Sequence, residues 1–442
     1  MMRSRRRELS LAAALCALLA GCAPSRPGPD AVDVRQVMRG GIAAHEEGDH
    51  AAFRAGFEQA DRLRPGHPGI LYNLACGRAL TGDVELALPL LDRLAAMGLT
   101  YEIAADDDLK ALRGTPRFDA LVARFMENGR PAVRSAIAFS LEDRDMLAEG
   151  IARDPRSGAR YVGSVHRRRI LRVDAQGKAT PLPASTGGAC ADRSGCRLYG
   201  VMGMAVDPER RVLWAASSAV PEMEGFTEQD RGRAQVARYD LDSGELTAII
   251  GSPNDGNPHM FGDLTVHHTG DLYISDSVSP AVHLLRQGGT EIEEWTRTGG
   301  YDALQGMAFS PDGERLYVAD YSRGLFAIDR ESRRLSPLSH PDDVAVSGID
   351  GLYFHDGSLI GIQNGLRPNR VVRFRLDPSQ RRITGSEVLE ANHPRFDDPT
   401  LGVVAEGALL YVANSQWARF SPRADQAAVD SRTAPVILRL PL

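Results

Sequence analysis

The feature that most constrains the fold of this 442-residue chain is a strand–turn–strand pattern that recurs six times after residue 131. Each unit begins with the residue named at the end of this paragraph, followed by an alternating apolar strand, a Gly/Asp turn and a second strand that ends in a small polar residue. Successive units start 43 to 60 residues apart. Repeats of this length are typical of propeller blades, which close radially and leave no long sheet edge exposed. The units begin at Glu149, Met202, Gly262, Gln305, Asp350 and Thr400.

A third alternating strand follows each unit, as in "RILRVD" and "QVARYD". We therefore expect an all-β six-bladed propeller over residues 131–442. The segment "VRSAIAFSL" at 133–141 precedes the first unit. We expect it to form the outer strand of the last blade and so to close the ring.

The preceding part of the chain, residues 32–130, has apolar residues spaced by three and four, which predicts amphipathic helices. Gly48-Asp49 recurs as Gly82-Asp83, an offset of 34 residues that matches the tetratricopeptide (TPR) period. A shorter third unit at 106–125 is expected to cap this array. Two repeats and a cap are near the minimum for independent stability, so the array could instead lean on the next domain. The fold class is therefore a multidomain α + β chain, a TPR-like array followed by a propeller.

The first 21 residues read as a targeting segment. Four arginines precede an apolar stretch at 9–20, which is too short for a permanent transmembrane helix. Leu19-Ala20-Gly21-Cys22 then matches the bacterial lipobox, which implies cleavage before Cys22 and acylation of its thiol. The alternative is an ordinary secretory signal with a cysteine there by chance. Residues 22–31, rich in Pro, Gly and Ser, are expected to form a tether.

These signals place the protein in the bacterial cell envelope, anchored to a membrane through Cys22 and facing the periplasm. Ala23 is not a retention signal of the aspartate type, which favours the outer membrane. Without the first 21 residues the chain has 48 basic and 57 acidic residues, a net charge of −9. Nucleic-acid binding usually needs a basic patch, so this balance argues against a nucleic-acid partner.

Three cysteines remain besides Cys16 of the signal and Cys22. Cys190 and Cys196 lie in a Gly-rich loop, and in an oxidising compartment we expect them to form a disulfide, with two free thiols as the alternative. Cys76 lies in an apolar helical pattern.

Several phrases resemble the gluconolactonase/regucalcin (senescence marker protein) propellers and, more distantly, the paraoxonases. They are "EGIA" at 149–152, "QGMAFSPDG" at 305–313 with "LYVAD" at 316–320, and "IDGL" at 349–352. The likeness spans residues 134–442. It implies that the first residues of several units converge on a divalent metal, usually Ca²⁺, at one mouth of the channel.

The family pattern has Glu in blade one, Asn-Asp in blade three, Asn in blade four and Asp in blade five. Glu149 and Asp350 match its two carboxylates, and Gln305 stands in the place of the blade-four Asn. In blade three Gly262 replaces the Asn, while Asp263 keeps the following carboxylate. The metal ligands implied by the resemblance are thus Glu149, Asp263, Gln305 and Asp350. The alternative is a solvated rim of charged side chains around a water-filled pore.

Two functions follow from these features. One is a metal-dependent hydrolase of a lactone or small ester, in which the resemblance makes Asp350 the general base or nucleophile. The other is a non-catalytic binding or assembly lipoprotein, in which the TPR-like repeats and the propeller both serve as platforms for protein partners. The chain has no G-x-S-x-G, P-loop or H-E-x-x-H motif.

Other polar residues are expected to serve structure. Asp276, Asp320 and Asn414 end their second strands in the same way, which indicates turn or inter-blade hydrogen bonds. His267 and His268 belong to a turn that we expect to be exposed. The insertion 221–233 interrupts blade two and could overhang the channel as a lid or bind a partner.

Overall fold

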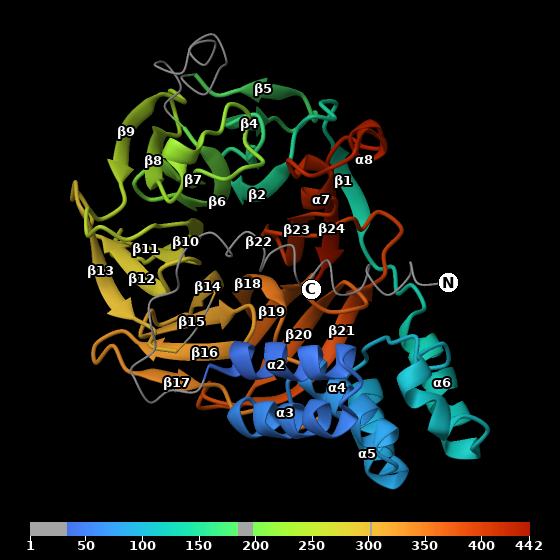
Figure 1. The fold of residues 1–442 in the computed structure, drawn as a ribbon. Helices are drawn as coiled ribbons and strands as arrows, with labels where there is room; N and C mark the ends of the chain where they lie inside the picture. Colours follow the sequence, from blue (N-terminus) through green and yellow to red (C-terminus); the bar gives the residue numbers. More distant parts are fainter. Residues whose placement is uncertain (1–32, 184–197, 301–302) are drawn as a thin grey trace.

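Six four-stranded antiparallel sheets surround one axis in the computed structural model, which describes residues 33–183, 198–300 and 303–442 (Figure 1). The predicted six-bladed propeller is therefore confirmed. In blades one to five the strands follow one another outward from the axis. Blade one comprises β2 (Ala148–Arg153), β3 (Arg160–Ser164), β4 (Arg169–Val173) and β5 (Ala179–Pro181). Blade two comprises β6 (Gly200–Asp207), β7 (Val212–Ser218), β8 (Ala234–Asp240) and β9 (Leu246–Gly251). Blade three comprises β10 (Phe261–Val266), β11 (Leu272–Asp276), β12 (Ala281–Leu285) and β13 (Ile292–Arg297).

The sixth blade is closed by the two ends of the propeller sequence. Its order is β1-β24-β23-β22, so the strand that precedes blade one forms its outer edge, as predicted. Blade four comprises β14 (Leu304–Phe309), β15 (Arg315–Asp320), β16 (Gly324–Asp329) and β17 (Leu335–Pro337). Blade five comprises β18 (Ile349–His355), β19 (Ser358–Gln363), β20 (Arg370–Leu376) and β21 (Ile383–Ala391). Blade six comprises β22 (Gly402–Ala405), β23 (Ala408–Val412), β24 (Val436–Pro441) and β1 (Ala136–Ser140).

The middle strands of the blades are covered on both sides. Every residue of β7, β11 and β23 is buried, because the adjacent blades pack against the two faces of each sheet. A strand covered on both faces is apolar along its whole length rather than strictly alternating. The second strands of the sequence pattern accordingly read as nearly continuous apolar runs.

The helical array, residues 34–128, consists of antiparallel helices joined by tight turns. Gly48 and Gly82 take positive φ values of 80° and 87° between paired helices, a conformation that favours glycine. Asp49 accepts a hydrogen bond from the Ala52 amide at 2.9 Å and so caps its helix. The helices are α2 (Val34–Glu46), α3 (His50–Leu63), α4 (Pro68–Leu80), α5 (Val84–Ala96), the 3₁₀ helix η2 (Asp107–Leu112) and α6 (Pro116–Asn128).

The array rests on blades four and five. Arg370, 2% exposed, donates from Nη1 to the carbonyls of Met97 at 2.8 Å and Gly98 at 3.2 Å, and from Nε to Gln363 Oε1 at 2.7 Å. The Thr100 amide donates to the Arg367 carbonyl at 2.8 Å. Ala345 of the propeller belongs to the same buried apolar cluster as the helices. The array therefore leans on the propeller, as the short repeat count suggested.

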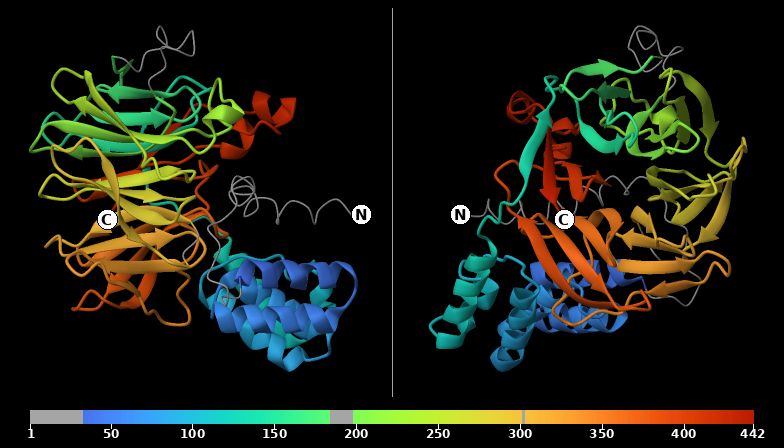
Figure 2. Two further views of the ribbon diagram at one scale, coloured as in Figure 1. Left: turned by 60° about the vertical axis from the view of Figure 1, so that its left-hand side comes forward. Right: turned by 180° about the vertical axis from the view of Figure 1, so that it is seen from behind.

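All these contacts lie on one face of the ring, which we call the entry face because the inner strands β2, β6, β10, β14 and β18 begin there. Two short helices missed by the strand pattern, α7 (Trp417–Phe420) and α8 (Gln426–Asp430), interrupt blade six between β23 and β24. They project on the same side as the helical array (Figure 2). The helical array and the pair α7 and α8 thus both project from the entry face.

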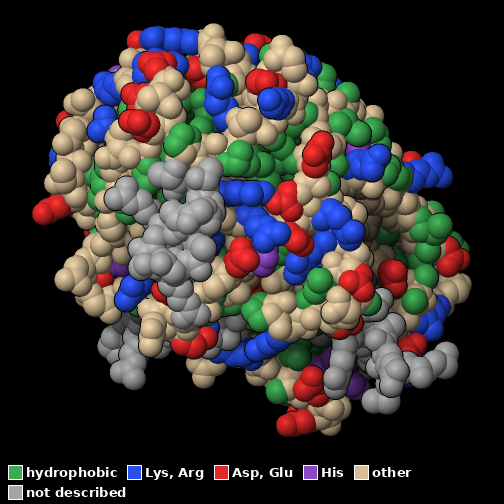
Figure 3. Space-filling model, turned by 90° about the horizontal axis from the view of Figure 1, so that it is seen from above, with side chains coloured by type: hydrophobic (Ala, Val, Ile, Leu, Met, Phe, Trp, Pro, Cys, Tyr) green, Lys and Arg blue, Asp and Glu red, His purple; other side chains and the backbone are tan. Residues whose placement is uncertain are grey.

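In the ranges that the structure describes, none of the helices is long and apolar enough to cross a bilayer. Cys22, the tether, and the pair Cys190 and Cys196 lie outside the described residues, and their modification and pairing stay predictions. Figure 3 shows Lys/Arg and Asp/Glu side chains interspersed over the face that it presents.

Candidate functional site

The inner strands of blades one to five share one irregularity near the entry face. Two residues of the inner strand lie opposite a single residue of its neighbour, at 149–150, 202–203, 262–263, 305–306 and 350–351. A bulge of this kind re-aims a side chain and is common beside functional sites. The first residue of each pair is the residue that starts the sequence unit. The aligned residues therefore occupy equivalent places around the channel.

The second residue of three of these pairs must be glycine for steric reasons. A Cβ on Gly150 would lie 2.3 Å from the Met202 carbonyl oxygen, and a Cβ on Gly306 would lie 2.3 Å from the Leu352 amide nitrogen. Gly203 faces Asp263 in the same way, with only 2.7 Å between its ideal Cβ and the Asp263 Cα. Neighbouring inner strands thus approach backbone to backbone here, and this fixes the spacing of the side chains beside them.

Three carboxylates are buried at this level. Glu149, Asp263 and Asp350 are each 7–8% exposed. Trp417 Nε1 donates to Glu149 Oε2 at 2.8 Å, and the Ser415 hydroxyl lies 3.3 Å from the same oxygen. Glu149 thus has two hydrogen-bond donors, both from blade six.

Asn364 holds the Asp350 carboxylate in place, because its Nδ2 donates to Asp350 Oδ2 at 2.8 Å. A fourth carboxylate, that of the half-buried Asp398, interacts electrostatically with two of these three carboxylates. Its negative charge raises the pKa of both Glu149 and Asp350. We call Glu149, Asp263, Asp350 and Asp398 the acidic rim.

Burial disfavours the charged form of every member of the acidic rim. It raises the pKa of Asp350 and of Asp263 to about 7 and that of Asp398 to about 6. It also raises the pKa of Glu149 well above its usual range, and the neighbouring Asp350 charge adds to this effect. Among the described residues, none of the four forms an ion pair within 4.0 Å. The rim is therefore a set of desolvated acids without a protein cation in contact.

Gln305 and Gly262 are spatially linked. Gln305 is 8% exposed, and within the described part of the chain its side chain has no hydrogen-bond partner. Its Oε1 lies 3.5 Å from the position that a Cβ on Gly262 would take. The longer amide of Gln305 thus points toward the space that a side chain at 262 would share.

The donors of this site are carboxylate and amide oxygens, which suit a hard divalent cation such as Ca²⁺. The acids do not form a closed cage. In the described ranges, two sets of three His, Cys, Asp or Glu side chains bring their ligand atoms within 4.8 Å of one another, and neither set includes a member of the rim. The residues fit a cation chemically, and binding would have to bring them closer together.

One of those two sets is a structural network in blade three. The Asp276 carboxylate accepts hydrogen bonds from the backbone amides of Met260, Val278 and Ser279, and its Oδ2 lies 2.6 Å from His259 Nδ1 and 3.3 Å from His283 Nε2. Both oxygens of Asp276 are therefore occupied.

The other strand-end residues behave alike: Asp320 Oδ1 accepts from the amides of Ser322 and Arg323, and Asn414 Oδ1 from that of Val436. The structural role predicted for Asp276, Asp320 and Asn414 is confirmed.

Around the rim, the entry face carries the insertion 221–233 and an open pocket. The insertion does not stand free, because the Glu224 amide donates to the His166 carbonyl at 2.9 Å and so ties it to blade one. A pocket of about 450 Å³ lies where the helical array meets blade five. Its wall includes Phe396, two residues before Asp398 in the same loop, and Arg367, whose charge lowers the pKa of Asp398. It is lined by Gly129, Pro131, Arg367, Asn369, Asn392, His393 and Phe396.

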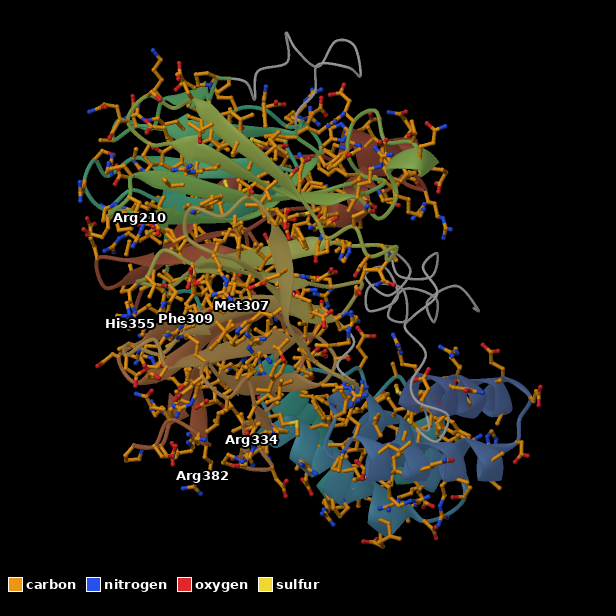
Figure 4. All side chains as sticks on the ribbon, turned by 90° about the vertical axis from the view of Figure 1, so that its left-hand side faces the viewer. Arg210, Met307, Phe309, Arg334, His355 and Arg382 are labelled. Carbon is orange, nitrogen blue, oxygen red and sulfur yellow. The ribbon has the colours of Figure 1, made fainter. Side chains whose placement is uncertain are left out.

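The opposite mouth of the channel has different chemistry. Arg210, Phe309 and His355 lie toward the end of the ring away from the helical array (Figure 4). His267, in the turn after β10, is only 2% exposed. The expectation of an exposed turn was wrong for this residue, because its imidazole packs edge-on against Phe309 at 4.9 Å between ring centroids.

Reasoning from sequence missed Asp398, Asn364 and Trp417. Asp398 lies in a loop with a positive φ of 63°, and Trp417 lies on a helix outside the repeated strands. Asn364 directly follows β19, at the position that Ser277 takes after β11 in blade three, and could have been noticed. The other two carry no pattern that would have marked them.

No protein-family model and no curated protein sequence matches this chain. Solved structures of similar fold include a gluconolactonase from Xanthomonas campestris, at 16% identity and a TM-score of 0.48 over 71% of this chain and 98% of that one. Two others are the PQQ-bound aldose sugar dehydrogenase of Streptomyces coelicolor (15%, 0.45, 71% and 98%) and the calcium-binding regucalcin of Agrobacterium tumefaciens (15%, 0.45, 69% and 93%). These proteins differ in activity, so the likeness assigns none to this chain.

Proposed function

We propose that the acidic rim binds a divalent cation, Ca²⁺ in the first instance, through Glu149, Asp263, Gln305 and Asp350. The observation that carries this proposal is the burial of three carboxylates that have no cationic partner in contact. Desolvated anions of this kind either hold protons or require a cation. Gln305, buried without a hydrogen-bond partner among the described residues, supplies a neutral oxygen beside them.

We further propose that the site hydrolyses a lactone or a small ester. A bound divalent ion would polarise the carbonyl group of such a substrate. Asp350 would take the proton of the attacking water as general base. Asn364 fixes one oxygen of Asp350, which leaves the other available. The adjoining pocket offers room for the remainder of the substrate.

The cellular setting is part of the same proposal. The lipobox at Cys22 would tether the protein to the membrane, with both domains in the periplasm, and the outer membrane is the favoured location. Radiolabelled palmitate incorporated by the wild type and not by Cys22→Ala tests this point. Labelling that persists in Cys22→Ala would contradict the anchor.

The second candidate function, that of a partner-binding lipoprotein, has less support on one face of the helical array. Helix α4 packs against η2, and Tyr72 of α4 stacks on Tyr101 with 4.3 Å between ring centroids. Its own chain thus covers that face. Large exposed apolar side chains such as Leu86 and Met126 remain on α5 and α6, and they are where a partner would bind.

The test is hydrolysis of a panel of lactones and aryl esters with added Ca²⁺ and with chelator. We expect turnover that needs Ca²⁺ and that Asp350→Asn abolishes. The matched control is Asp356→Asn, an exposed acid in the turn after the same strand, which should retain full turnover. Turnover that survives Asp350→Asn, or is insensitive to chelator, would refute the enzymatic proposal.

A further inference from the structure

Four side chains with metal-binding chemistry meet inside the helical array, outside the acidic rim. Cys76 of α4 and the carboxylates of Asp106 and Asp108 bring their ligand atoms within 4.8 Å of one another. His45, in the last turn of α2, adds Nε2 at 3.0 Å from Asp108 Oδ2. The donors come from three elements that are far apart in the sequence: the end of α2, the middle of α4 and the start of η2.

These donors are held in place by their own neighbours. Asp106 caps η2, since its Oδ1 accepts from the Asp108 amide at 3.0 Å, and its Oδ2 accepts from the Tyr72 hydroxyl at 2.6 Å. The His45 ring stacks on Phe53 with 4.6 Å between centroids. Ligands fixed in this way by surrounding hydrogen bonds and packing are typical of metal sites, where such support tunes affinity.

The cluster is reachable from solvent although its thiol is buried. Cys76 is 2% exposed. The two acids and His45 are only partly buried, so an ion has a path to the cluster from solvent.

We propose that His45, Cys76, Asp106 and Asp108 form a binding site for a Zn²⁺-class transition-metal ion. Zinc takes four ligands of this kind, thiolate, imidazole and carboxylate, at about 2.0–2.3 Å. A thiolate and an imidazole disfavour Ca²⁺ and Mg²⁺, so this site and the acidic rim would select different ions. The blade-three set around Asp276 lacks this character, because it contains no thiol and its carboxylate accepts from three backbone amides as well as facing two imidazoles.

Such an ion would stabilise the array, because it would link α2 to α4 and to η2. Metal binding of this type contributes its free energy to folding, because the unfolded chain has no preformed site. Two helical pairs are few for a repeat array, and a structural metal is one way in which small domains gain stability.

The experiment uses the full chain in detergent, stripped of metal by a chelator and then titrated with Co²⁺. We expect one Co²⁺ per chain to produce the near-ultraviolet thiolate-to-cobalt absorption, and Zn²⁺ to displace it. Cys76→Ser should abolish the absorption, and Asp108→Asn should weaken binding about tenfold or more. The matched control is Asp107→Asn, a more exposed neighbour that pairs with Arg113, which should bind like the wild type.

Two further variants keep the result unambiguous. Cys190→Ser/Cys196→Ser should retain the absorption, which would assign it to Cys76. Asp350→Asn should retain it as well, which separates this site from the acidic rim. If Cys76→Ser proves unstable by circular dichroism, loss of Co²⁺ affinity in Asp108→Asn carries the test. A wild type without thiolate absorption, or absorption that Cys76→Ser leaves unchanged, would overturn the proposal.

Discussion

The acidic rim and the interface between the two domains both bury charge, and they do so in opposite ways. At the interface, Arg370 is fully buried, yet its donors meet the carbonyls of Met97 and Gly98 and the amide oxygen of Gln363. At the rim, Asp350 and Asp263 are almost as buried but have no cation within ion-pairing distance among the described residues.

Hydrogen bonds to a buried charge offset its loss of water, whereas a buried charge with few partners costs stability. The difference indicates that the interface is built for stability and the rim for a ligand.

The largest expected effect is on activity at the rim. Replacing Asp350 by Asn keeps the shape and removes the base, so hydrolysis should fall on the order of 10²–10⁴-fold. Steady-state kinetics should show the loss in kcat rather than in KM. An Asp350→Asn enzyme with near-normal kcat would show that the rim is not catalytic.

Next in size is the loss of stability at the interface. Arg370→Met leaves three acceptors unsatisfied in a buried position, and we expect a loss of about 2–4 kcal/mol in the free energy of unfolding. Denaturant unfolding measures this. The control is Arg395→Met, a change on the exposed surface of the same region, which should be within about 0.5 kcal/mol of the wild type. Equal effects of the two changes would mean that Arg370 does not hold the domains together.

A smaller effect is the pH dependence of stability without divalent ions. The rim acids have folded pKa values above their unfolded values, so their contribution is present below pH about 4 and is lost as pH rises through about 7. In chelator the melting temperature should therefore fall over this range.

Asp350→Asn should relieve part of this loss and be about 1–3 kcal/mol more stable than the wild type at pH 8. The two proteins should melt alike at pH 4. A variant that is less stable at pH 8 would contradict the electrostatic account of the rim.

The smallest effect concerns the neighbouring positions 262 and 305. In Gly262→Asn/Gln305→Asn, a ligand gained at 262 offsets the shorter side chain at 305, and Ca²⁺ affinity should rise by on the order of 1 kcal/mol. Gly262→Asn alone should gain less, because the new Cβ would lie 3.5 Å from Oε1 of the longer Gln305 side chain and 3.0 Å from Ser277 Oγ. Calorimetric titration of both variants checks this, and a larger gain in the single variant would contradict the proposed link.

Much of the ring could be predicted from the sequence because its regularity is local. The residue that starts each unit coincides with the bulge of the inner strand, and the glycine that often follows is required by backbone contact with the next blade. The closing strand was recognisable for the same reason.

The composition of the rim could not be predicted in full. Asp398 lies in the loop that joins blade five to blade six, Trp417 lies in an insertion between β23 and β24, and neither belongs to the repeated strand pattern. The burial of His267 likewise depends on Phe309 in the next blade. The TPR-like assignment, the disulfide and the lipid anchor stay predictions from sequence.

The most direct test of the central claim, that unpaired acids at the rim await a cation, is calorimetric titration of the chelator-treated protein with Ca²⁺ at pH 7. Two buffers of different ionisation enthalpy would be compared. Asp350 and Asp263 are partly protonated at this pH, so one Ca²⁺ should bind with release of protons, and Asp350→Asn should lose most of both the binding and the release. Saturable binding that is unchanged in Asp350→Asn, or no binding at all, would contradict it.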